Sequence, residues 1–243
     1  MRLSAVIAMN YIESTNSSLV SEAIGEITAF MRGADLSPGD KLPSESYFAR
    51  ELNKSRTVVR EAFRSLAALN LIKLNAGKRA EVAALDYSTI SPVIEHGIHT
   101  EQISVQQVYD VRRTIEMRTA TLAALRRSET QAETILFHAK SMVAHRDNPE
   151  NIMSHDIAFH QTIAMASCNP IFALMIGAFE GVTKLTWPVG WKSRESQDKQ
   201  EFMLNVHLAI AEAIRDGNPQ EANKQMALHF DESVRALLEA GIQ

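Results

Sequence analysis

The chain has 243 residues, of which 45% are hydrophobic and 22% charged; this balance excludes wholesale disorder and allows one large domain or two small ones. Only 10 Gly and 7 Pro are present, which favours long helices over a turn-rich β fold, and the single cysteine, Cys168, excludes an intrachain disulfide and a multi-cysteine zinc site. The net charge of −4 excludes a uniformly basic chain, so any affinity for nucleic acid has to come from a local segment.

The first residues carry no membrane signal. The apolar run at 5–9 is too short for the core of a signal peptide, and no apolar run in the chain approaches the length that crosses a bilayer. We therefore expect a cytoplasmic protein with no membrane partner, which agrees with the lone cysteine. We interpret residues 1–17 as an N-terminal extension.

Residues 18–83 contain the elements of one small domain. Apolar residues recur at helical spacing over 19–33, and turn residues follow them. Ser44 and Ser55 are each placed to cap a further helix that has an apolar stripe. Two short alternating runs on either side of residues 75–78, which include a glycine, predict a β-hairpin. The predicted order is helix, helix, turn, helix, hairpin.

Only helical patterns follow the linker that we expect at 84–103. Ser128 and Gln131 form the pattern of a capping box, which marks one helix start. The sequence therefore predicts an all-helical domain over 104–243. Its expected helices are 104–127, 129–146, 150–167, 170–186, a stretch that ends at Asp216, and 219–240, with residues 187–191 as an interruption.

Positive charge is concentrated in residues 50–79, which hold eight Lys or Arg and two Asp or Glu. Such a segment is an electrostatic footprint for a polyanion. Arg56, Arg60 and Arg64 are four residues apart and share one face of the third helix. Arginine can pair bidentately with guanine or with phosphate, and Thr57 in the first turn can reach a phosphate or a thymine methyl group.

The tip of the predicted hairpin is also basic. Gly77, Lys78 and Arg79 would suit the DNA backbone or the minor groove. Arginines at this spacing, taken alone, are better explained as a solvated basic helix face. Together with the order of the elements, they favour DNA binding.

Three stretches of this segment resemble the N-terminal signature of GntR-family bacterial regulators, namely 36–45, 55–66 and 71–72. The resemblance implies a winged helix-turn-helix in which Arg56, Thr57 and Arg60 match DNA-contacting positions. Gly77 matches the glycine at the tip of the wing. The chain departs from the family at Ser46, where the family often has an arginine.

One such domain buries too little surface for tight and specific binding to double-stranded DNA. We therefore expect a homodimer that binds an inverted-repeat operator. The two recognition helices would lie about one turn of DNA apart or less.

Four side chains that can bind metal fall on apolar faces of the predicted C-terminal helices. Asp156 and His160 are i, i+4 on one helix and point to the same side, while His207 and His229 lie on inward faces of two other helices. A carboxylate on an apolar face needs a partner, and these groups could converge inside a bundle. Spacing alone favours hydrogen-bonded core histidines and an intrahelical ion pair.

The C-terminal part resembles the FCD sensor domain of the FadR-like branch of the GntR family over 104–235. The matching pieces are 108–116, 156–160, 166–169, 207–214 and 226–229. The resemblance implies an antiparallel all-α bundle in which the positions of Asp156, His160, His207 and His229 bind a divalent metal. Zinc is the expected ion, with nickel or manganese as alternatives. Val206 stands where the family often has an acidic residue.

Two further features have alternative interpretations. Arg112 matches an arginine frequent in FCD domains, which implies a clamp on an effector carboxylate, but an ion pair with Glu116 at i+4 explains it equally well. Trp187 and Trp191 would either form a wall of the pocket or belong to the core, and the core is favoured.

The resemblance implies a transcription regulator and not an enzyme. The expected mechanism is a repressor that a small carboxylic acid at the metal site releases or modulates. A metal-dependent hydrolase fused to a DNA-binding module is one alternative, although no motif such as His-Glu-x-x-His supplies a general base. A constitutive DNA-binding protein with a structural metal is another.

Overall fold

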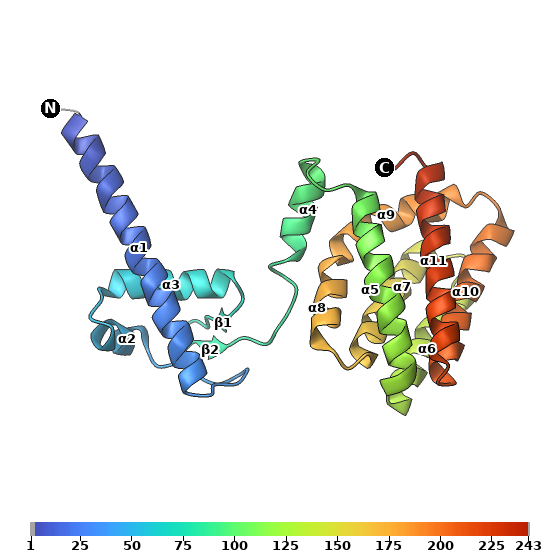
Figure 1. Cartoon of the computed structure of the whole chain (residues 1–243), viewed down its shortest axis with the longest axis horizontal. Coiled ribbons are helices and arrows are strands. Elements are labelled where there is room, and N and C mark those ends of the chain that lie inside the picture. Colours follow the sequence, from blue (N-terminus) through green and yellow to red (C-terminus); the bar gives the residue numbers. More distant parts are fainter. Residues whose placement is uncertain (1–2, 243) are drawn as a thin grey trace. The chain divides into compact units, whose positions relative to one another are not determined.

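The computed structural model describes residues 3–242, with side chains from Ser18 onwards, and divides into two compact units, Met1–Thr89 and Ile90–Gln243 (Figure 1). Each unit has its own apolar core. The described residues form eleven helices and one two-stranded sheet, so the fold is mainly α, as the sequence predicted. Within this part of the chain no helix is long and apolar enough to cross a membrane.

The first unit is a winged helix-turn-helix. Its elements are α1 (Leu3–Gly33), α2 (Glu45–Glu51), α3 (Arg56–Ala68), β1 (Ile72–Lys73) and β2 (Glu81–Val82). The side chains of Ser44 and Ser55 accept hydrogen bonds from the first turns of α2 and α3, which confirms both predicted caps. The two strands pair antiparallel. Helix α1 begins at Leu3, so it includes most of the stretch 1–17 that was predicted as an N-terminal extension. Residues 1 and 2 lie outside the described part.

Aromatic rings fill the core of this unit. Phe48 is 1% exposed, and its ring contacts Phe30 and Phe63 edge-on at centroid distances of 5.2 and 5.7 Å. These three residues belong to α1, α2 and α3. The contacts therefore hold the three helices together and fix the face that α3 leaves exposed.

The second unit is an all-helical bundle. Its helices are α4 (Ser91–His99), α5 (Val105–Arg126), α6 (Glu129–Ala144), α7 (Pro149–Ala166), α8 (Pro170–Ala178), α9 (Glu180–Ser193), α10 (Gln197–Arg215) and α11 (Pro219–Glu239). Helix α5 packs against α7, α10 and α11, and α6 packs against α7 and α10 (Figure 1). The capping box predicted at Ser128 and Gln131 is present.

The segment expected as a linker, 84–103, differs from that expectation because α4 occupies its middle. Ile94 and Ile98 pack with residues of α8 and α9, so α4 belongs to the second unit. Two apparent helix breakers are compatible with this helix. Pro92 lies in its first turn, where no N–H is required. A Cβ at Gly97 would lie 2.6 Å from Ile103 Cδ1, so a glycine allows this close packing.

The interruption predicted at 187–191 was wrong. The break comes earlier, at Phe179, which ends α8 and starts α9. Helix α9 continues through Pro188, although an internal proline typically costs about 3 kcal/mol. Burial of Trp191 and its stacking on Trp187, with centroids 5.2 Å apart, help to offset that cost.

We expect Phe48→Ala to destabilise the first unit by about 3–5 kcal/mol, because it removes the ring that joins three helices. Both tryptophans lie in the second unit. In a urea titration, the part of the far-UV circular dichroism signal that comes from the first unit should therefore be lost at a lower urea concentration. The unfolding transition seen by tryptophan fluorescence, which reports the second unit, should not move. The matched control is Phe137→Ala, since Phe137 is 58% exposed. Equal shifts of both signals in F48A would contradict two independent cores.

Candidate functional site

Four ligand-competent side chains meet inside the second unit. Asp156 and His160 lie one turn apart on α7, His207 comes from α10 and His229 from α11, and one ligand atom of each lies within 4.8 Å of the others. All four residues are buried. The structure thus brings together the residues that the sequence singled out as metal ligands.

The hydrogen bonds around these rings leave nitrogen lone pairs without partners. His207 Nδ1 donates to the Met203 carbonyl at 2.8 Å, so Nε2 of the neutral ring carries no proton, yet it lies 2.8 Å from Asp156 Oδ1. Two acceptors this close need a proton or a cation between them. Within the described part of the chain, His160 Nε2 and His229 Nδ1 are buried and have no hydrogen-bond partner. A cation bound to these atoms would remove the cost of leaving them unpaired.

The distances also fit a shared ion. Two ligand atoms that are each about 2.1 Å from one ion are about 3.0 Å apart at a right angle and at most about 4.2 Å apart. The separation of 2.8 Å between His207 Nε2 and Asp156 Oδ1 is close to the first value. The largest separation in the group, within 4.8 Å, needs a contraction of only about 0.6 Å.

Glu116 on α5 orients one of these ligands. Its carboxylate accepts a hydrogen bond from His160 Nδ1 and another from Arg112 Nε at 2.9 Å. The bond to Nδ1 leaves the lone pair of His160 on Nε2, the nitrogen that faces Asp156 at 3.9 Å. Residue spacing indicates Glu116 only as a partner of Arg112. Its contact with His160 joins two helices and has no signature in residue spacing.

Electrostatics keep the group ready to bind a cation. Burial acts to raise the pKa of the Asp156 carboxyl, but the close contact with His207 and the nearby His160 outweigh it and hold that pKa below its usual value. The pKa of Glu116 is lowered in the same way by His160 and Arg112, against burial. Burial, with the neighbouring histidines, places the pKa of His229 well below its usual value. His229 is therefore neutral and able to coordinate a metal.

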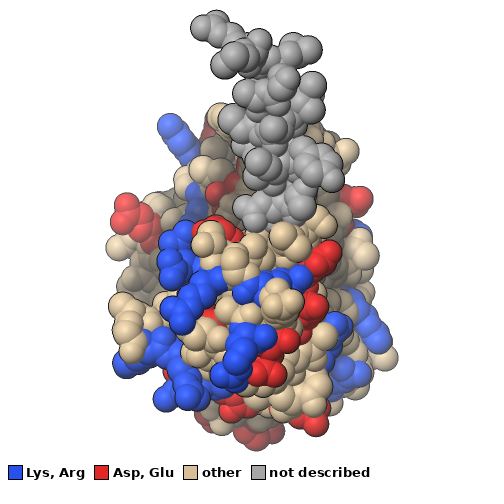
Figure 2. Space-filling model, turned by 90° about the vertical axis from the view of Figure 1, so that its left-hand side faces the viewer, with Lys and Arg blue, Asp and Glu red and all other residues tan. Residues whose placement is uncertain are grey.

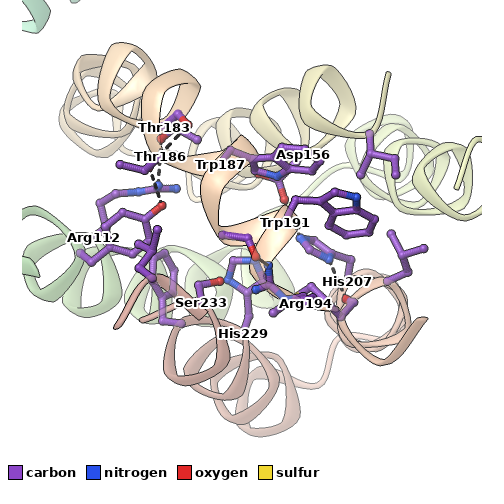
Figure 3. Close-up of a pocket in the computed structure, with 17 residues that line it drawn as sticks. Arg112, Asp156, Thr183, Thr186, Trp187, Trp191, Arg194, His207, His229 and Ser233 are labelled. Atoms are coloured by element: carbon purple, nitrogen blue, oxygen red, sulfur yellow. Dashed lines mark hydrogen bonds and ion pairs between the residues drawn. The ribbon is translucent and has the colours of Figure 1, made fainter. Parts of the chain in front are cut away.

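A cavity of about 40 Å³ lies beside three of the four residues (Figure 3). Asp156, His207 and His229 form one side of it. Helix α9 contributes a different wall of hydroxyl groups and indole rings, made by Thr183, Thr186, Trp187 and Trp191. The two tryptophans therefore line the pocket, and the core position favoured from sequence is only part of their role.

In the first unit, the predicted DNA-contacting residues are exposed on one element. Arg56, Thr57, Arg60 and Arg64 all lie on α3 and are exposed. Arg60 Nε contacts Glu45 Oε2 at 3.4 Å, and Arg64 Nη1 contacts Glu61 Oε1 at 2.7 Å. Figure 2 views the molecule from the side of this unit and shows Lys and Arg side chains gathered on the face turned to the viewer, with acidic groups between them.

The turn of the hairpin is exposed as well. Gly77 has φ +70°, a left-handed conformation that favours glycine. Lys78, the next residue, is exposed. The wing therefore has the glycine turn and the basic tip that the sequence predicted.

Comparison with known protein families follows the same division of the chain. Residues 107–232 match the FCD domain, and residues 19–82 match the family described as bacterial regulatory proteins, gntR family. The chain belongs to the GntR family of regulators, with an FCD domain. The match confirms the resemblance inferred from the sequence and assigns the protein to transcription regulators and not to enzymes.

Relatives of this GntR-family regulator are named as regulators too. It is 27% identical over 207 residues to the HTH-type transcriptional regulator LutR of Bacillus subtilis. The aligned part is 82% of this chain and 92% of LutR. It is also 27% identical over 208 residues to the galactonate operon transcriptional repressor of Escherichia coli, with 83% and 89% covered. The solved structure of a Streptococcus agalactiae GntR protein has the same fold, with a TM-score of 0.68, 24% identity and 89% and 98% coverage.

Both interpretations of Arg112 in the regulator have a counterpart in the structure. Arg112 is 5% exposed and lines the cavity, and its Nε donates to Glu116. Its Nη1 donates to Thr183 Oγ1 at 2.9 Å, and the guanidinium lies 5.3 Å from the ring centroids of both Tyr109 and Phe230. The predicted ion pair is present, and it occupies donors that an effector clamp would need.

Other residues that line the pocket were missed in the sequence. Tyr109, Thr183, Thr186, Arg194 and Ser233 are polar residues of the cavity wall. The Tyr109 and Thr186 hydroxyl groups are hydrogen-bonded at 3.0 Å across two helices. Only Tyr109 lies in a stretch that resembles the FCD domain, 108–116, and the packing of α5, α9 and α11 brings the five residues together.

We expect Glu116→Gln to lower the affinity of the regulator for a divalent metal by about 10- to 100-fold, because it weakens the bond that orients His160. Competition with a chromophoric chelator measures this affinity. Glu133→Gln is the control, since it makes the same change of charge at an exposed site. A melting curve of the metal-free proteins separates loss of affinity from loss of fold. An affinity of E116Q within twofold of wild type would show that Glu116 has no role at the metal site.

Proposed function

We propose that the protein is a homodimeric repressor that binds an inverted-repeat operator through α3 and the wing. A small carboxylic acid, bound in the cavity of the FCD domain beside a divalent metal ion, weakens this binding. The metal would be held by Asp156, His160, His207 and His229, with zinc expected from the donor set and nickel or manganese as alternatives. The proposal depends most on the buried histidine nitrogens that have no hydrogen-bond partner.

The DNA-binding half rests on the exposed face of α3. Arg56, at the first turn, makes no ion pair with the other described residues, so its guanidinium is available to a phosphate or a base edge. Arg60 is held only by an exposed contact to Glu45, which has little strength in water. Thr57 and Arg64 extend the same helix, and Gly77 and Lys78 form the wing tip. Two such domains in a dimer would supply enough phosphate contacts for specific binding.

The sensor half rests on the cavity. A divalent cation that takes five or six ligands would act there as a Lewis acid to which a carboxylate can coordinate, since three histidines and one carboxylate fill only four positions. The chain itself supplies the rest of the recognition. Thr183 and Thr186 offer hydroxyl groups, and the stacked Trp187 and Trp191 exclude water from one side. The name of the galactonate operon repressor, which refers to a carboxylic acid, agrees with an effector of this class.

The pocket and α4 are linked by one helix. Helix α9 carries the pocket residues Thr183 and Trp187, and α4 packs against α9. A Cβ at Gly181 would lie 1.8 Å from Glu95 Oε1, so these two helices approach closely at this point. An effector that binds one arrangement of α9 better than another would thereby change the population of α4 positions.

The cavity does not favour the hydrolase alternative. Hydrolysis needs a general base that is free to take a proton. Asp156 is the one carboxylate among the residues of the described cavity wall, and in this proposal it is a metal ligand and not a free base. Glu116 behind the wall is shared by Arg112 and His160.

A cognate duplex can be selected from a randomised library with the wild-type protein. We expect Arg56→Ala or Arg60→Ala to reduce the affinity for this duplex by at least about tenfold, since each contact is lost twice in a dimer. Fluorescence anisotropy measures this affinity. If phosphate contacts are lost, the affinity of the variant should depend less steeply on salt concentration. Arg113→Ala in the FCD domain, which breaks an exposed pair with Asp231, is the control. Unchanged affinity in both α3 variants would refute this recognition surface.

We expect carboxylic acids that are effectors to raise the melting temperature of the metal-loaded protein and to weaken its binding to the same duplex. His207→Ala should abolish most of both effects, because it removes a metal ligand. His138→Ala, which changes a histidine outside the metal group, is the control. If chelation lowers the melting temperature but leaves the response to the acid intact, the metal is structural only.

A further inference from the structure

We propose that Arg194 binds a second anionic group of the effector, so that the acid accepted by the pocket is a small dicarboxylate. This inference rests on the proposed function, in which the metal centre holds the first carboxylate. It concerns a residue of the cavity wall that neither the metal group nor the ion pair of Arg112 uses.

Arg194 lies at the end of α9, where it is the C-cap residue. It lines the cavity together with Trp191, His207 and His229 (Figure 3). The side chain is partly buried, and its Nη1 donates to the Gly190 carbonyl at 2.7 Å. This bond holds the base of the guanidinium against α9 and leaves its other donors for a ligand.

No carboxylate neutralises this guanidinium in the described part of the chain. The acidic groups that act on it from a distance include Asp156, Glu232 and Glu239. Each of them has another partner: Asp156 is bound to His207 at 2.8 Å, and the two glutamates are paired with Arg235 at 2.9 Å and with Lys199 at 3.5 Å. Arg194 thus makes no ion pair with any described residue.

The contrast with Arg112 identifies which arginine is free for a ligand. Arg112 already has Glu116 and Thr183 as hydrogen-bond partners and two aromatic rings beside it. Arg194 has only one backbone carbonyl. Burial lowers the pKa of Arg194, and no carboxylate of the described residues contacts its guanidinium to offset this. An anion in the cavity would restore that balance.

The charges around the cavity add up to two positive charges once a divalent ion is bound. The ion with Asp156 and three neutral histidines leaves one positive charge. Arg112 and Glu116 cancel each other, and Arg194 adds the second charge. A dicarboxylate neutralises both charges, whereas a monocarboxylate leaves one of them uncompensated in a site withdrawn from water.

The size of the cavity limits the chain length. Its volume of about 40 Å³ is room for about three water molecules, at roughly 10–15 Å³ each on this measure. Malonate and succinate already have more non-hydrogen atoms than that, so the cavity wall has to move to admit them, and the shortest diacids are favoured over longer ones.

The test compares malonate and succinate with propionate and butyrate, which match them in carbon number and lack one charge. The chain has two tryptophans, both in the cavity wall, so quenching of their fluorescence in the metal-loaded dimer reports binding. Arg194→Gln should lower the affinity for succinate and malonate by about 10- to 100-fold and should change the affinity for the monocarboxylates by less than about threefold. Arg194→Lys, which keeps the charge, should recover part of the loss.

Arg215→Gln is the matched control, since it removes an exposed arginine of the same domain that is paired with Asp216 and does not line the cavity. Metal content after each titration shows that the diacid has not removed the ion. Equal affinity of wild type for both classes of acid, or an unchanged affinity of R194Q for the diacids, would overturn the role of Arg194 while leaving a metal-bound acid in place. Failure of every acid to bind the metal-loaded wild type would overturn the proposed function with it.

Discussion

The FCD domain is built around one constraint: charged and polar groups placed inside an apolar bundle must find partners there. Asp156 and Glu116 are both buried, and each lies among the apolar side chains of several helices. Removing the partner of a buried charge costs far more than an exposed ion pair contributes. The network of Asp156 with His207 and of Glu116 with His160 and Arg112 therefore fixes how α5, α7 and α10 pack.

The same network leaves a deficit that points to ligands. His160 and His207 are oriented by their outer hydrogen bonds, while the buried His160 Nε2 and His229 Nδ1 have no hydrogen-bond partner among the described residues. Arg194 shows the opposite deficit, a guanidinium without an anion. A cation and a small acid in adjacent positions would satisfy both. The cavity is thus an incomplete polar core, and its completion by ligands gives the domain a physical reason to change stability or arrangement when they bind.

Sequence reasoning succeeded where the determinants are local. Ser44, Ser55 and Ser128 cap the helices that they were predicted to cap, because capping depends on a few consecutive residues. It was less successful where packing decides. The linker prediction missed α4, and Pro188 lies inside a helix. The partners of Glu116 and the position of Arg194 depend on helices that are distant in the chain, so residue spacing could not reveal them.

The sequence by itself determined the family, the two kinds of domain and the four candidate ligands, because a motif and a helical period can be recognised without coordinates. Only the tertiary structure decided that those four groups meet, since Asp156 and His207 are 51 residues apart. It also decided that Arg112 is paired with a carboxylate and that Arg194 is not paired with one among the described residues. Both depend on what α5, α9 and α11 place around a shared cavity, and that arrangement is a property of packing across the whole bundle.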